Sequence, residues 1–116
     1  SGSAKSNPDD DQSINPIHSS LPMDEPEFRE IVIDFIPQLE LKLAEMETTL
    51  LAKDFVELAG LAHWLKGAGG TCGFNEFYNP SVKLEEAARN KDPEAAQRSI
   101  ETLLRLTNRI EIPEPV

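Results

Sequence analysis

The stretch from Ala62 to Gly70 reads AHWLKGAGG and is the most informative part of this 116-residue chain. The apolar pattern around it has a helical period, so the stretch belongs to a helix that carries one histidine and then three glycines in four positions. Each glycine in a helix interior costs roughly 1 kcal/mol relative to alanine. A helix that tolerates this cost beside His63 and Lys66 needs open space there.

Apolar residues recur at steps of three and four along most of the chain, which predicts helices and no strands. Pro37 interrupts the first stripe, and it either kinks one long helix or begins a second one. Of these, we expect a short helix over 26–36 and a longer one over 37–52. The predicted buried stripe of these two helices is Ile31, Phe35, Leu39, Leu43, Met46 and Leu50.

The next helix contains the histidine. Asp54 is expected to cap its start, with Glu57 three residues later, and Gly73 is expected to stop the helix just after Thr71. Its predicted inner face is Phe55, Leu58, Ala62, Leu65 and Gly69.

Two further helices complete the fold. Asn75 is expected to cap the fourth, with Phe77, Ser81, Leu84 and Ala88 inward. Asp92 and Pro93 are typical of a helix start, and Pro113 and Pro115 are expected to end that last helix. Its predicted inner face is Ala96, Ile100, Leu103, Thr107 and Ile110. Short loops favour antiparallel neighbours, so we predict an all-α, up-down four-helix bundle preceded by a short N-terminal helix.

The first residues differ in composition from the rest. Residues 1–3 resemble a cloning scar, and residues 7–20 are rich in Asp, Ser, Asn and Pro, which predicts a flexible linker over 1–24. The expected domain is 25–112, followed by a C-terminal tail over 113–116. Such a linker suggests the C-terminal domain of a longer protein.

The formal net charge of −10 and pI of about 4.5 argue against nucleic acid and anionic membranes as partners. No apolar run approaches the roughly 18 residues that span a bilayer. The single cysteine, Cys72, has no partner for an internal disulfide, which fits a reducing compartment. We therefore expect a cytoplasmic location.

A helical wheel surrounds His63 with small residues and one cation, Lys66. One interpretation is an ordinary surface histidine on a helix that packs tightly on its neighbour. Tight packing explains Gly69 on the inner face, but it does not explain Gly67 and Gly70 on the histidine's own face.

Two kinds of chemistry use such a histidine. Metal binding is disfavoured, because the only other histidine is His18 in the tail, Cys72 is nine residues away, and no carboxylate lies within a turn of His63. Nucleophilic attack on phosphorus is favoured, because a neutral imidazole can attack and Lys66 can neutralise charge. No serine or acidic residue is expected to orient the histidine, which argues against a triad.

The sequence resembles histidine-containing phosphotransfer (HPt) domains over roughly residues 25–110. The residues that carry the resemblance are His63-Trp64-Leu65-Lys66-Gly67, Gly73, Phe77, Leu84 and Glu85, with Asp54 and Ala62 upstream. The resemblance implies a helical bundle that accepts a phosphoryl group on a histidine from the aspartyl phosphate of one receiver domain and passes it to the aspartate of another.

The resemblance also implies a role for each site residue. His63 would be phosphorylated, Lys66 would neutralise the phosphate, and Gly67 would give clearance. Apart from the resemblance, Gly70 and Gln38 are candidate residues for docking a partner. The domain would be a monomer without an ATP site or a cofactor, and the magnesium would belong to the receiver. The stretch from Ala62 to Gly73 also resembles the C-terminal module of BarA/GacS-type hybrid sensor kinases, whose parent chain is anchored in the inner membrane.

The chain departs from the family pattern at Trp64, expected to pack under the N-terminal helix, and at Pro80 in the fourth helix. Besides Gln38, Lys83 and Arg89 could line the rim of the site, although solvated surface is the preferred interpretation for all three. Two alternative functions stay open: the dimerising phosphoacceptor region of a sensor kinase, whose histidine is usually followed by an acidic residue, and a helical interaction module.

Overall fold

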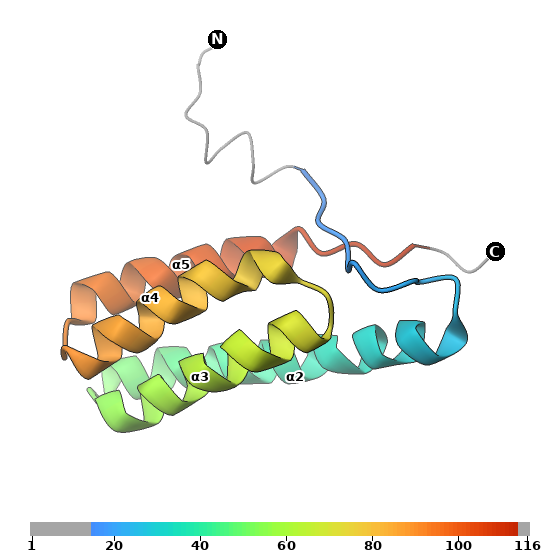
Figure 1. Cartoon of the computed structure of the whole chain (residues 1–116). Helices are drawn as coiled ribbons and strands as arrows, with labels where there is room; N and C mark the ends of the chain where they lie inside the picture. Colours follow the sequence, from blue (N-terminus) through green and yellow to red (C-terminus); the bar gives the residue numbers. More distant parts are fainter. Residues whose placement is uncertain (1–14, 114–116) are drawn as a thin grey trace, which may run out of the picture.

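The computed structural model describes residues 15–113. These residues contain four α-helices and one 3-10 turn: α2 (Pro26–Leu51), α3 (Phe55–Thr71), η1 (Asn75–Phe77), α4 (Tyr78–Arg89) and α5 (Pro93–Asn108). Consecutive helices run in opposite directions, and α2 extends beyond the end of the bundle (Figure 1). Each helix packs on two others, α3 on α2 and α4, and α5 on α4 and α2. The predicted all-α class and up-down four-helix bundle are confirmed.

The predicted break at Pro37 is wrong, because α2 is one continuous helix through this residue. Proline removes one backbone hydrogen bond, here the one that would run to the carbonyl of Ile33. Pro37 is exposed and Ile33 is 45% exposed, so water can reach this region of the backbone. Phe35 and Leu39 on either side are buried and hold the helix on the core. There is therefore no separate short helix over 26–36.

The buried stripe of α2 agrees with the prediction except at its start. The buried residue there is Val32, at 1% exposed, and Ile31 is 45% exposed. Val32 lies three residues before Phe35, so it continues the stripe at a helical step and Ile31 falls outside it. The buried residues of α2 are Val32, Phe35, Leu39, Leu43, Met46 and Leu50.

Side-chain caps start two of the helices as predicted. The carboxylate of Asp54 accepts from the backbone N–H of Glu57 at 3.2 Å, and that of Asp92 accepts from Ala95 at 3.1 Å. These contacts satisfy donors that the first helical turn leaves unpaired.

Gly73 ends α3 as predicted, with a φ of +83°. Its N–H donates to the carbonyl of Gly70 at 3.0 Å, and the N–H of Phe74 donates to Gly69 at 2.8 Å. These two bonds form a Schellman motif, which favours glycine at the left-handed position.

The predicted cap at Asn75 and the predicted end of α5 are wrong. Asn75 is the first residue of the 3-10 turn, and it makes no cap for α4. The turn forms because Phe74 and Phe77 are both fully buried and draw this connection into the core. The last helix ends at Asn108, because the following residues pair with the N-terminal segment.

That N-terminal segment differs from the expected linker in the part the structure describes. Ile17 is 4% exposed and forms a parallel β-bridge with Ile110. Leu21 and Met23 pack against the core as partly buried residues. The predicted cloning scar lies outside the described residues, as does most of the predicted C-terminal tail.

Candidate functional site

The candidate site lies on the face shared by α3 and α4. Leu58, Ala62 and Leu65 fix the rotation of α3, because their side chains are fully buried in the core. This rotation places His63 at the surface beside α4, with its side chain 68% exposed. The predicted exposure of His63 is confirmed.

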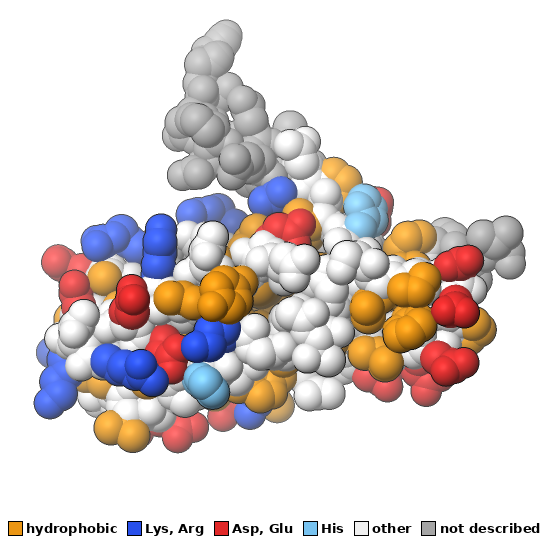
Figure 2. Space-filling view, viewed as in Figure 1, with side chains coloured by type: hydrophobic (Ala, Val, Ile, Leu, Met, Phe, Trp, Pro, Cys, Tyr) orange, Lys and Arg blue, Asp and Glu red, His pale blue; other side chains and the backbone are white. Residues whose placement is uncertain are grey.

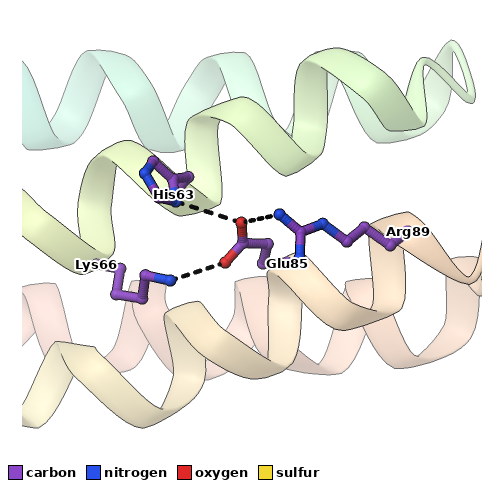
Figure 3. A network of polar contacts seen from close by, with 4 residues as sticks. All are labelled: His63, Lys66, Glu85 and Arg89. Atoms are coloured by element: carbon purple, nitrogen blue, oxygen red, sulfur yellow. Dashed lines mark hydrogen bonds and ion pairs between the residues drawn. The ribbon is translucent and has the colours of Figure 1, made fainter.

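Glu85 of α4 lies at the centre of a polar network (Figure 3). Its carboxylate is 6% exposed, and its Oε2 lies 3.3 Å from Nδ1 of His63. Nζ of Lys66 donates to Oε1 at 3.1 Å, and the guanidinium of Arg89 donates to Oε2 at 2.7 Å. Three basic groups from two helices therefore meet one buried carboxylate.

This environment keeps Glu85 ionised. Burial raises the pKa of its carboxyl group, but the hydrogen bond from Lys66 and the charges of Arg89, Lys66 and His63 lower it by more. The net result is a pKa below the ordinary value of 4.5. A buried charge without partners would be costly, so the three basic side chains explain how the Glu85 carboxylate stays ionised inside the bundle at neutral pH.

The contact with Glu85 distinguishes the two nitrogens of His63. A proton on Nδ1 would lie against this carboxylate, and in the neutral ring that tautomer has its free lone pair on Nε2. The sequence-based expectation that no acidic residue orients the histidine is therefore wrong. Glu85 is distant in sequence, and only the packing of α4 on α3 brings it to the imidazole. The Leu84-Glu85 pair was the signal that could have located it.

The cations near the histidine also differ from expectation. Lys66 was expected to be available for phosphate, and it pairs with Glu85 and is 28% exposed. Arg89, expected to be solvated surface, joins the same carboxylate while 68% of its side chain stays exposed. Lys83 is exposed and lines a groove between α4 and α5, on a different side of α4.

The glycines divide as the helical wheel indicates. A Cβ on Gly69 would lie 3.1 Å from the Cβ of Phe77, so this glycine permits tight packing. Gly67 and Gly70 are exposed, and a Cβ at either would meet nothing within 4 Å. The fold itself therefore does not require glycine at these two positions.

Trp64 packs inward on α2, in agreement with the prediction. Its ring lies 6.1 Å from that of Phe35, and Nζ of Lys42 lies 5.6 Å from the ring centre.

Gln38 also lies on α2, where its side chain donates weakly to the carbonyl of Asp34 at 3.5 Å. Pro80 is the third residue of α4, and the first turn of a helix offers no carbonyl to a backbone N–H, so the N–H that proline lacks costs no hydrogen bond there.

The described residues show neither a metal site nor a membrane span. Residues 15–113 contain no group of three or more His, Cys, Asp or Glu side chains arranged to hold a metal ion. Within the same residues, no helix combines the length and the apolar character needed to cross a bilayer. Cys72 is buried, and burial raises the pKa of its thiol.

The fold and the site together define a helical bundle that presents one oriented imidazole at an open surface. The chain matches the model of the Hpt domain family over residues 30–112, and it belongs to this family. Hpt domains are phosphocarriers without kinase activity of their own; they perform histidine phosphotransfer in phosphorelays and interact with receiver domains. Searches of curated proteins and of solved structures gave no match.

Proposed function

We propose that His63 is the phosphoacceptor of this domain. The observation that carries the proposal is the contact between Nδ1 and Glu85, which directs the free lone pair of the neutral ring to the Nε2 position. Nε2 attacks the phosphorus of an aspartyl phosphate on a receiver domain. The N–P bond forms, the P–O bond to the aspartate breaks, and the aspartate leaves as a carboxylate.

No proton needs to move in this step. The ring keeps its proton on Nδ1 and gains a positive charge when the N–P bond forms. The carboxylate of Glu85 stabilises this imidazolium through its contact with Nδ1. Transfer to the aspartate of a second receiver is the same step in reverse and returns a neutral imidazole.

Lys66 and Arg89 are placed to neutralise the phosphoryl group. Both side chains are flexible and now bond to Glu85, so they can exchange one carboxylate bond for a phosphoryl oxygen. Lys66 and Arg89 lie beside His63 on the α3–α4 face, whereas the whole chain has a net charge of −10. Figure 2 shows acidic side chains at the start of α2 and also among the basic side chains at the other end of the bundle. The two cations themselves favour approach of an acidic receiver pocket to the α3–α4 face.

Gly67 and Gly70 give the receiver room to approach. Their open outer surface supports this role, because neither position is needed for packing within the bundle. Gln38 is a less favoured docking residue, since it lies on α2. We propose that the magnesium ion belongs to the receiver and that this domain needs no cofactor.

A monomeric carrier is favoured over the alternative functions. A dimerising phosphoacceptor hairpin would bury its core only on association, whereas the helices of this chain bury their own apolar stripes. A simple interaction module would not need a carboxylate at the imidazole. We propose that the parent protein is a hybrid sensor kinase of the type that the sequence resembles.

Transfer from a phosphorylated receiver tests the proposal. The protein should acquire an acid-labile label from the receiver and none from ATP alone. The variant His63→Gln should lose the label, and His18→Gln, which changes the other histidine, should keep it. Label that persists in His63→Gln would contradict the assignment.

A further inference from the structure

Residues 15–21 form a strap that lies across the end of the bundle where α3 and α5 both finish (Figure 1). Its first attachment is to the end of α5. The N–H of Ile17 donates to the carbonyl of Arg109 at 2.8 Å, and its carbonyl accepts from Glu111 at 3.0 Å. The side chain of Ile17 is only 4% exposed, so its burial in the core also anchors this end of the strap.

The second attachment is to the loop that ends α3. The hydroxyl of Ser19 donates to the carbonyl of Cys72 at 2.5 Å and accepts from the N–H of Leu21 at 3.1 Å. The N–H of Ser20 donates to the carbonyl of Gly73 at 2.9 Å. The strap therefore holds both residues of the Cys72–Gly73 loop.

The helix before this loop is intrinsically weak. Relative to alanine, each glycine lowers the local helix equilibrium about fivefold. Gly67, Gly69 and Gly70 all lie in the last turns of α3, and the outer sides of Gly67 and Gly70 are open. Helical order there depends on Gly69 packing against Phe77 and on a fixed C-terminal loop.

We propose that the strap is a positioning device for the docking surface. By fixing the Cys72–Gly73 loop it keeps the last turns of α3 helical, and so presents Gly67 and Gly70 beside His63. The functional part of this proposal rests on the proposed phosphotransfer. The strap lies outside residues 30–112, so it is not part of the family match.

Amide hydrogen exchange on the full chain tests the structural part. Ser19→Ala should speed exchange of the Cys72, Gly73 and Phe74 amides about fivefold, the factor that corresponds to one typical hydrogen bond. The matched control is His18→Ala, which removes only the 3.0 Å contact with Glu111 and should leave these amides unchanged. Unchanged exchange in Ser19→Ala, or an equal increase in all four helices, would overturn the proposal.

A second substitution separates helix order from other effects. Gly70→Ala adds a methyl group that meets nothing within 4 Å and raises the helix equilibrium about fivefold. Added to Ser19→Ala, it should return the three amides to their original exchange rates. If the double variant exchanges as fast as Ser19→Ala, helix weakness is not what the strap corrects.

Phosphotransfer kinetics test the functional part. Ile17→Asp places a charge at a buried position, and this should detach the strap from the bundle. It should raise KM for the phosphorylated receiver several-fold and leave kcat unchanged, because docking is affected and the chemistry at His63 is not. A fall in kcat with constant KM would overturn this role. If the original protein accepts no phosphoryl group, the proposed function fails, while the exchange results still decide whether the strap orders α3.

Discussion

At the residue scale, Glu85 has the largest influence on the site. It is buried, it comes from a different helix than the histidine, and it contacts three basic side chains. The same carboxylate joins α3 to α4 and, in the proposed mechanism, selects the nitrogen of His63 that reacts. Stability and reactivity therefore depend on one group and can be measured on one variant.

Glu85→Gln should destabilise the fold at neutral pH by roughly 1–3 kcal/mol, because it removes a buried charge that accepts charge-assisted hydrogen bonds. The pKa of Glu85 is lowered in the folded state, so this stabilisation is fully present above its ordinary value of 4.5 and is lost as pH falls below that value. Urea unfolding followed by Trp64 fluorescence, from pH 7 to pH 3, measures both proteins. A stability difference that stays constant down to pH 3 would contradict the assigned ionisation.

Gly67→Leu separates docking from folding. The leucine should block the approach of a receiver and abolish most transfer. It should also stabilise α3 by up to about 1 kcal/mol, because it removes the glycine cost at an open position. Denaturation and transfer assays on the same preparation measure the two effects. Normal transfer in this variant would show that the clearance argument is wrong.

At the element scale, three helix ends follow local sequence rules, whereas the start of α4, the end of α5 and the expected boundary at Pro37 do not. Asp54, Asp92 and Gly73 act as predicted, because a cap involves only residues a few positions apart. Asn75 does not cap α4, because burial of Phe74 and Phe77 determines the path of the chain there. Local rules therefore predict helix ends well, except where core packing overrides them.

Lys53 and Lys91 occupy the left-handed position after α2 and α4, with φ of +56° and +54°. Lysine is strained in this conformation and glycine is not. Lys91→Gly should therefore stabilise the protein by about 0.5–1 kcal/mol. The matched control Asn90→Gly changes a residue with φ of −86° and should give no gain in a thermal or urea unfolding experiment. Equal effects of the two substitutions would refute the strain argument.

At the scale of the whole molecule, the sequence was sufficient to predict the fold class, most of the core and the exposed histidine. These features follow from the helical period, which is visible along the chain. The Glu85 contact and the strap depend on which helices become neighbours and could not be read from spacing alone. Pro37 gave a wrong boundary, because the buried residues on both sides of it outweigh one missing hydrogen bond.

The proposed mechanism requires that Nε2 of His63 carries the phosphoryl group while Nδ1 remains protonated against Glu85. Nitrogen-15 and phosphorus-31 NMR on protein phosphorylated by a receiver domain measures this directly. We predict a single N–P coupling at Nε2 of His63 and a protonated Nδ1. A phosphoryl group on Nδ1, or on any other residue, would contradict the account.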